Sequence, residues 1–174
     1  SEAVDYSRKA CDLGYGGGCF NLGVLYHNGE GVKQSYSKAA DYCRKACDLR
    51  YGAGCLNLGD SYHNGEGVKQ SYSKAADYWR KACDLGDGGG CNNLGLLYDN
   101  GEGVKQSYSE AADYYRKACD LGDEAGCFNL GNSYSKGEGV KQSYSEAKKF
   151  YGKACDMKND LGCNNYAILN KRGY

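Results

Sequence analysis

The chain has 174 residues, and its 22 basic and 22 acidic side chains give a formal net charge of zero. Neither sign of charge gathers into a run, so a surface for nucleic acid or for an anionic membrane is not expected. No apolar stretch approaches the roughly 18 residues of a membrane span and no signal peptide opens the sequence, so we expect a soluble chain, either mature or trimmed.

The sequence repeats itself every 36 residues, and each repeat carries a pair of cysteines. A period of this length indicates stacked supersecondary units, each of which buries its apolar face against its neighbours. Function is then expected on a surface rather than in an enclosed enzyme core. We expect one repeat domain with units at approximately 1–34, 35–70, 71–106, 107–142 and 143–174.

The first predicted helix covers residues 2–13, and its equivalent in the next unit covers residues 35–49. In the latter, apolar or small residues recur at i, i+4, i+7 and i+11, which is the spacing of one helix face. Ser35 is a natural N-cap for this helix, and Ser107 and Ser143 begin S-x-x-E capping boxes in later units.

A second helix is predicted in each unit. Gly52 and Gly54 are expected to separate the two helices, and the second then runs from Cys55 to a stop at Asn64 and the glycine after it. Gly23, in the preceding unit, is expected to let a neighbouring helix come close. Each unit is therefore expected to be a helical hairpin. The connector GEGVKQSYS recurs in four copies, and one residue in each is expected to act as an apolar plug: Val32, Val68, Val104 and Val140.

The spacing of the cysteines favours disulfides over a metal site. Zinc ligands usually come as C-x2-4-C, whereas each unit here has C-x7-C, with only His27 and His63 as further nitrogen ligands. Each pair runs from the end of one helix to the start of the next, where antiparallel helices come close enough for a bridge. Disulfides indicate an oxidising compartment, either periplasmic or extracellular. The expected bonds join Cys11 to Cys19, Cys47 to Cys55, Cys83 to Cys91, Cys119 to Cys127 and Cys155 to Cys163.

Cys43 is the odd cysteine of the chain. Its counterparts in the other units are Ser7, Trp79, Tyr115 and Tyr151, and all are expected on the inward side of their helix. We therefore expect Cys43 to be a buried, unpaired thiol rather than a reactive one.

Two motifs, G-C-x-N-L-G-x-x-Y and K-A-A-D-Y-x-x-K-A-C, cover essentially the whole chain. With these motifs the units resemble Sel-one-like repeats, which are relatives of the tetratricopeptide repeat. The cysteine pair is similar to that of the secreted Helicobacter cysteine-rich proteins. The resemblance implies an all-α fold, a right-handed α-solenoid of about ten helices in stacked hairpins. It also implies a concave face made largely by the Cys-x-Asn-Leu-Gly helices.

Three columns of the Cys-x-Asn-Leu-Gly helices vary against an otherwise uniform background. In one unit they are residues 20, 24 and 27, which share a face about 130° away from the core stripe of the same helix. Packing against neighbouring helices is not expected to require the same residue at these positions in every unit. By analogy with the tetratricopeptide family, these positions would line a groove for extended peptides. We call these residues the variable ridge: Phe20, Val24, His27, Leu56, Asp60, His63, Asn92, Leu96, Asp99, Phe128, Asn132 and Ser135.

An invariant asparagine lies beside the variable ridge in every unit, and its amide can donate and accept hydrogen bonds toward a peptide backbone. Two alternatives stay open. Each asparagine can instead hydrogen-bond an inter-helix loop, and ridge variation can reflect only the tolerance of exposed sites. This asparagine ladder consists of Asn21, Asn57, Asn93, Asn129 and Asn165.

A β-lactam-binding hydrolase is the enzyme alternative, because some relatives among the cysteine-rich proteins are described as acting on β-lactams. Ser35 with Lys38, and Ser71 with Lys74, match the S-x-x-K motif. The same serines are helix N-caps, however, two of the four copies carry Glu at the lysine position, and no S-D-N or K-T-G partner follows. The histidines lack a carboxylate pattern for a triad. No catalytic residue, metal or cofactor is expected.

The sequence therefore predicts a non-enzymatic module that binds an extended peptide or a protein surface and is itself a monomer. No nucleic-acid or membrane partner is expected. The alternative is a designed consensus scaffold with no native ligand, because the repeats agree even at positions without an evident packing role, such as Lys33, Gln34 and Ser37.

Overall fold

The computed structural model describes all 174 residues and consists of helices joined by short connectors, with no strand. The all-α class and the number of helices predicted from the repeat are confirmed. The helices are α1 (Glu2–Asp12), α2 (Gly16–Asn28), α3 (Tyr36–Asp48), α4 (Gly52–Asn64), α5 (Tyr72–Asp84), α6 (Gly88–Asn100), α7 (Tyr108–Asp120), α8 (Glu124–Lys136), α9 (Tyr144–Asp156) and α10 (Asp160–Lys171).

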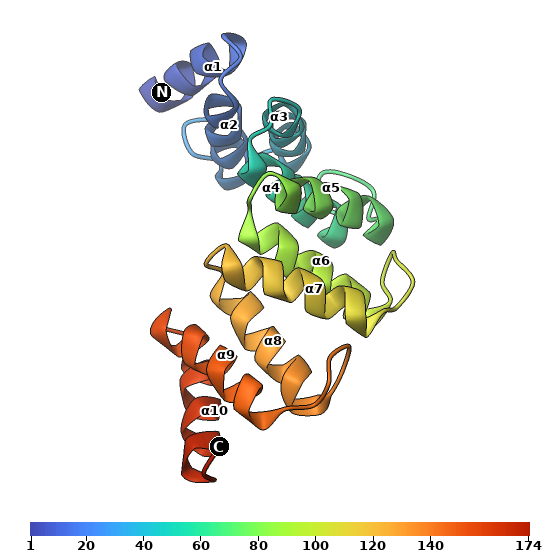
Figure 1. The fold of residues 1–174 in the computed structure, drawn as a ribbon. Helices are drawn as coiled ribbons and strands as arrows, with labels where there is room; N and C mark the ends of the chain where they lie inside the picture. The colour runs from blue at the N-terminus through green and yellow to red at the C-terminus, as the bar shows by residue number, and fades with distance from the viewer. The chain divides into compact units, whose positions relative to one another are not determined.

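The helices group into two compact units, Ser1–Gly90 and Cys91–Tyr174. In the first unit each of α1 to α4 packs against the helix that follows it, up to α5 (Figure 1). In the second unit the same is true from α7 through α8 and α9 to α10. Sequential helices therefore form the hairpins that the 36-residue period predicts.

The odd-numbered helices begin at a capping serine, as predicted. The Ser35 hydroxyl accepts a hydrogen bond from the backbone N–H of Lys38 at 3.3 Å, and Ser107 does the same for Glu110 at 3.2 Å. Such a side chain satisfies one of the N–H groups that have no partner in the first turn of a helix. Alanine then fills the inward face, with Ala39 and Ala40 buried in α3.

The even-numbered helices begin three residues earlier than predicted. Gly52 is the first residue of α4 and Gly54 lies in its first turn, so neither separates the two helices. The chain reverses instead at Arg50, whose φ of 65° is left-handed. Gly54 is small because α3 lies against it, and a Cβ there would come within 2.6 Å of the Cβ of Ala46. A glycine needed for close packing looks the same in the sequence as a glycine that ends a helix.

The first four even-numbered helices, α2, α4, α6 and α8, end as predicted, at the first glycine of the connector. Gly29 follows α2 with a φ of 72°, and Gly65 follows α4 with a φ of 71°. This left-handed conformation is easy for glycine and lets its N–H bond back to the last turn. The valine plugs are partly buried, and Val32 packs against Val4 and Leu22.

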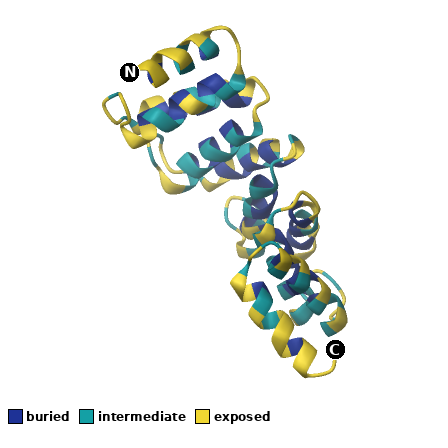
Figure 2. Cartoon of the chain, turned by 90° about the vertical axis from the view of Figure 1, so that its left-hand side faces the viewer, coloured by how far each residue is buried: buried dark blue, intermediate teal, exposed yellow.

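The predicted disulfides form, and ten of the eleven cysteines are disulfide-bonded. In the Cys11–Cys19 bond the Cα atoms lie 4.4 Å apart, and in Cys47–Cys55 they lie 4.6 Å apart. On the chain-entropy model, closing so short a loop stabilises the fold by about 2.5 kcal/mol per bond. These bonds support a core in which the buried positions lie along the facing sides of the helices (Figure 2).

Candidate functional site

One column of the odd-numbered helices determines how much of the variable ridge stays free. In α5 the indole Nε1–H of Trp79 donates to the backbone oxygen of Leu56 and to Oδ1 of Asp60, each at 3.1 Å. In α7 the Tyr115 hydroxyl donates to Oδ2 of Asp99 at 2.6 Å. These bonds show that part of the ridge holds an aromatic side chain of the next helix in place.

Tyr151 of α9 follows the same pattern, and its hydroxyl donates to Oδ1 of Asn132 at 2.6 Å. The interpretation that neighbouring helices do not constrain the ridge was therefore wrong for Asp60, Asp99 and Asn132. A helical wheel places these side chains away from the core of their own helix, but it does not include a long side chain that reaches across from the next helix.

Each aromatic ring lies over a glycine of the preceding even-numbered helix. A Cβ at Gly59 would come within 2.4 Å of Cδ1 of Trp79, and one at Gly95 would come within 2.6 Å of Cε1 of Tyr115. The glycine of the Cys-x-Asn-Leu-Gly motif therefore makes room for the ring. Gly23, the equivalent residue of α2, has only Cys43 Sγ and the α3 backbone in that direction. The predicted close approach at Gly23 is confirmed.

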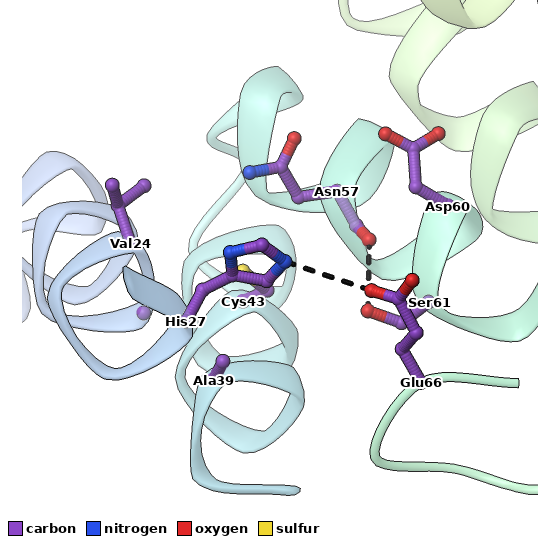
Figure 3. A pocket seen from close by; sticks show the side chains of 9 residues that line it. Val24, His27, Ala39, Cys43, Asn57, Asp60, Ser61 and Glu66 are labelled. Atoms are coloured by element: carbon purple, nitrogen blue, oxygen red, sulfur yellow. Dashed lines mark hydrogen bonds and ion pairs between the residues drawn. The ribbon is translucent and has the colours of Figure 1, made fainter. Parts of the chain in front are cut away.

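Because Cys43 is smaller than tryptophan or tyrosine, a pocket of about 260 Å³ remains in the first unit (Figure 3). Val24 and His27 of α2 lie on one side, and Asn57 and Asp60 of α4 lie on the other. Two successive even-numbered helices thus contribute ridge and ladder residues to one site. The sequence pattern singled out these residues and Cys43 separately, but it did not predict the pocket. The signal available in the sequence was a cysteine where the three later units have an aromatic residue, opposite a glycine that the first four units share.

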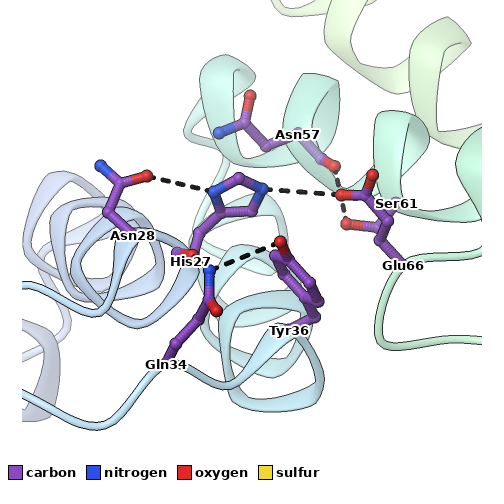
Figure 4. Close-up of polar contacts among 7 residues, drawn as sticks. All are labelled: His27, Asn28, Gln34, Tyr36, Asn57, Ser61 and Glu66. Atoms are coloured by element: carbon purple, nitrogen blue, oxygen red, sulfur yellow. Dashed lines mark hydrogen bonds and ion pairs between the residues drawn. The ribbon is translucent and has the colours of Figure 1, made fainter.

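His27 is held at the mouth of this pocket by several contacts (Figure 4). Its Nε2 lies 3.6 Å from Oε2 of Glu66, its Nδ1 lies 3.2 Å from Oδ1 of Asn28, and its ring packs on Tyr36 with centroids 5.0 Å apart. Glu66 belongs to the connector after α4, so the His27–Glu66 contact joins consecutive hairpins across the pocket. The Ser61 hydroxyl on the same side donates to the backbone oxygen of Asn57 at 3.1 Å.

The pocket perturbs two ionisable groups. Burial raises the pKa of the Asp60 carboxyl to about 6, partly offset by the hydrogen bond from Trp79 and the charge of His63. Burial and the nearby Asp60 charge raise the pKa of the Cys43 thiol to about 11. Cys43 is free and only 4% exposed, so it is a protonated thiol at neutral pH. The expectation of a buried, unpaired cysteine is confirmed.

The remaining ridge residues differ in how free they are. The Phe20 ring contacts Tyr51 with centroids 5.4 Å apart, and the His63 ring contacts Trp79 at 5.3 Å. Phe128 likewise contacts Tyr151 at 5.7 Å. Leu96 by contrast is 39% exposed. Leu56 and Ser135 are partly buried.

The asparagine ladder is also mixed. Asn21 is exposed, and Asn57, Asn93 and Asn129 are partly buried. The Nδ2 of Asn129 donates to Oδ1 of the buried ridge residue Asn92 at 2.9 Å. This amide therefore bonds a ridge residue of the preceding repeat. That partner is neither the peptide backbone nor the inter-helix loop expected for the ladder.

The S-x-x-K matches do not assemble as a catalytic pair. The Ser35 hydroxyl caps α3, and the Lys38 ammonium lies over the Tyr26 ring at 5.3 Å from its centroid. In the next unit Lys74 lies over the Tyr62 ring at 5.4 Å in the same way. A lysine that pairs with an aromatic face is not placed to take a proton from the serine.

Comparison with known proteins gives a family match along most of the chain. The model described as Sel1 repeat matches residues 1–15, 17–51, 52–87, 89–123 and 125–159. Among curated proteins, a 38-residue stretch is 53% identical to HcpC of Helicobacter pylori, which is named provisionally as a β-lactamase. That stretch is 22% of this chain and 13% of HcpC.

Two solved structures extend the likeness. A protective antigen present in uropathogenic Escherichia coli strains, with an SLR fold, superposes with a TM-score of 0.91 at 30% identity, covering 98% of this chain and 36% of that one. Helicobacter pylori cysteine rich protein B superposes with a TM-score of 0.62 at 39% identity, covering 78% of this chain and 98% of that one. The chain thus spans about a third of the length of the E. coli protein, and its match to HcpC covers 13% of that protein.

Proposed function

Because the chain belongs to the Sel1 repeat family, we propose that it is a non-enzymatic module that binds an extended peptide or a protein segment. One observation carries this proposal: Val24 and His27 of α2 line the same pocket as Asn57 and Asp60 of α4. Equivalent columns of successive repeats therefore face a common side, which is how repeat proteins present an extended binding surface.

The proposed contact residues are those of the variable ridge and the asparagine ladder. Within this set we assign side-chain selectivity to Val24 and His27, which line the pocket, and to Leu96, which is 39% exposed. We assign backbone contacts to Asn21 and Asn57, whose side-chain amides are free to pair with a peptide.

Hydrolysis of β-lactams is the alternative suggested by the name of HcpC. The described geometry gives it no support, since Ser35 and Ser71 serve as N-caps and Lys38 and Lys74 pack on tyrosine rings. An acyl-transfer enzyme needs its nucleophile and base within hydrogen-bond reach.

An oxidising, extracytoplasmic location is consistent with the disulfides and with the likeness to the Helicobacter proteins. We propose a secreted or periplasmic protein that acts as a monomer. None of the helices combines the length and the apolar composition that crossing a bilayer would require.

A peptide-library selection on the oxidised protein tests the function. We expect a shared motif to be enriched on the parent and lost on a ridge variant that combines Val24→Ser, His27→Ser and Leu96→Ser. The matched control carries three serine substitutions at exposed connector lysines and should keep the enrichment. These connector lysines are Lys33, Lys69 and Lys105.

Equal enrichment on the ridge variant would remove the ridge from the function. No enrichment on the parent would favour the alternative of a consensus scaffold with no native ligand, which the near-identical connectors suggest.

A further inference from the structure

The pocket above Cys43 is the space that an aromatic side chain occupies in later repeats. Trp79, Tyr115 and Tyr151 each place a ring over the motif glycine and donate a hydrogen bond to a ridge side chain. At Cys43 the glycine and the ridge are present but the ring is not. In this repeat the residues that surround the ring elsewhere are present, and the space for the ring itself is empty.

The polar lining of the pocket is acidic. Asp60 and Glu66 contribute two carboxylates, and no lysine or arginine lines the site. Asp60 accepts only the neutral indole N–H of Trp79, and Glu66 pairs with His27 at a loose 3.6 Å. The two acidic groups are therefore not neutralised by a strong cationic partner in the protein itself.

The base of the pocket is apolar. Val24, Ala39 and Cys43 form this part of the lining. Cys43 is only 4% exposed and makes no disulfide. In Figure 3 its sulfur lies at the back of the pocket, behind the His27 ring. An apolar floor below an acidic rim suits a side chain with an apolar stem and a cationic end.

We propose that this pocket receives an arginine or lysine side chain from a peptide bound along the variable ridge. The inference rests on the proposed function and specifies its ligand. The aliphatic stem packs on Val24 and Cys43, and the cationic end lies between the carboxylates of Asp60 and Glu66. Arginine is the better fit, because its planar guanidinium offers several donors to two separate carboxylates.

The only tryptophan of the chain provides a direct probe. The Trp79 indole N–H donates to Asp60, so a cation arriving at Asp60 will shift its single indole N–H resonance in a ¹H–¹⁵N NMR spectrum. The probe peptide is acetyl-Gly-Gly-Arg-Gly-Gly-amide. Two control peptides replace arginine by citrulline, which keeps the shape without the charge, and by tyrosine, which mimics the ring of the filled repeats.

We expect a saturable shift with the arginine peptide, at least tenfold weaker affinity with the citrulline peptide, and loss of binding when salt is raised. Cys43→Tyr should reduce affinity at least tenfold, because the ring fills the pocket as Tyr115 does. Asp60→Asn should reduce it about fivefold, whereas Asp113→Asn makes the same charge change at an exposed site outside the pocket and should not alter it.

Binding of the citrulline or tyrosine peptide as tightly as the arginine peptide would overturn the proposal. So would an unchanged affinity in Cys43→Tyr, provided that its circular dichroism shows the parent helix content. A library motif that is enriched on the parent and equally on Cys43→Tyr would leave the proposed function standing and the basic-residue pocket refuted.

Discussion

The interface at Cys43 and the interface at Tyr115 are built from almost the same sequence but differ in what fills them. At Tyr115 a phenol ring is 1% exposed and its hydroxyl is bonded to Asp99. At Cys43 a buried free thiol lies beside a pocket of about 260 Å³. One residue per repeat thus decides whether the ridge above it supports the fold or is available to a ligand.

The largest effect is expected from removing the ring of a filled interface. Tyr115→Ala should lower the free energy of unfolding by about 4 kcal/mol, because it leaves a cavity and leaves the partly buried Asp99 without its hydrogen-bond donor. Cys43→Ala should cost only about 1 kcal/mol, because removing one sulfur atom leaves a much smaller cavity than removing a phenol ring. Urea unfolding followed by circular dichroism measures both, and equal losses would contradict the comparison.

A smaller effect of opposite sign is expected from filling the open interface. Cys43→Tyr should raise the free energy of unfolding by about 1.5 kcal/mol, because the ring buries apolar area in a space bounded by Gly23. The temperature midpoint of unfolding measures this gain in stability, on a variant that keeps the neighbouring pocket residues Ala39 and Val24. A lower midpoint than that of the parent would contradict the prediction, because it would show that the residues around Cys43 do not leave room for a tyrosine ring as those around Tyr115 do.

The smallest effect concerns Asp60, which lines the open pocket at Cys43 and also accepts a hydrogen bond from Trp79 of a filled interface. Its pKa is about 6 in the native state and has its ordinary value of 3.8 in an exposed chain. Between these values the native state holds a proton that the unfolded state has lost, so native stability falls as pH rises from about 4 to about 6 and is then constant. Asp60→Asn removes this cost and can still accept from Trp79, as Asn132 accepts from Tyr151.

We expect Asp60→Asn to be more stable than the parent by on the order of 1 kcal/mol at pH 7, a value reduced because the side chain is only partly buried, and no more stable at pH 3.5. Melting temperatures at the two pH values measure the difference. The exposed variant Asp113→Asn is the control. A gain of the same size at both pH values would show that ionisation of Asp60 is not its cause.

Much of the fold could be predicted because it depends on local patterns. The capping serines, the alanine faces and the C-x7-C spacing each act within one hairpin, and all appear as predicted in α3 and α4. The prediction failed where two roles share one residue type. Gly54 was expected to break a helix and instead allows a neighbour to approach, because only the packed structure shows what lies against it.

The candidate site was predictable only in part. Sequence variation singled out Val24, His27 and Asp60, and the contact role of these residues stays a prediction. Variation could not show that Asp60 also binds the indole of Trp79, because these residues come from different helices and meet only when hairpins pack.

By itself, the sequence determined the repeat, the helices, the disulfides and the burial of Cys43, since each follows from short-range spacing and the need to bury apolar faces. Only the tertiary structure decided which ridge residues bind the next helix and which line a pocket. The physical reason is that a side chain as long as Trp79 reaches across the helix interface, whereas Cys43 does not. The space left above Cys43 is bounded by residues of three different helices, and no local sequence pattern brings those residues together.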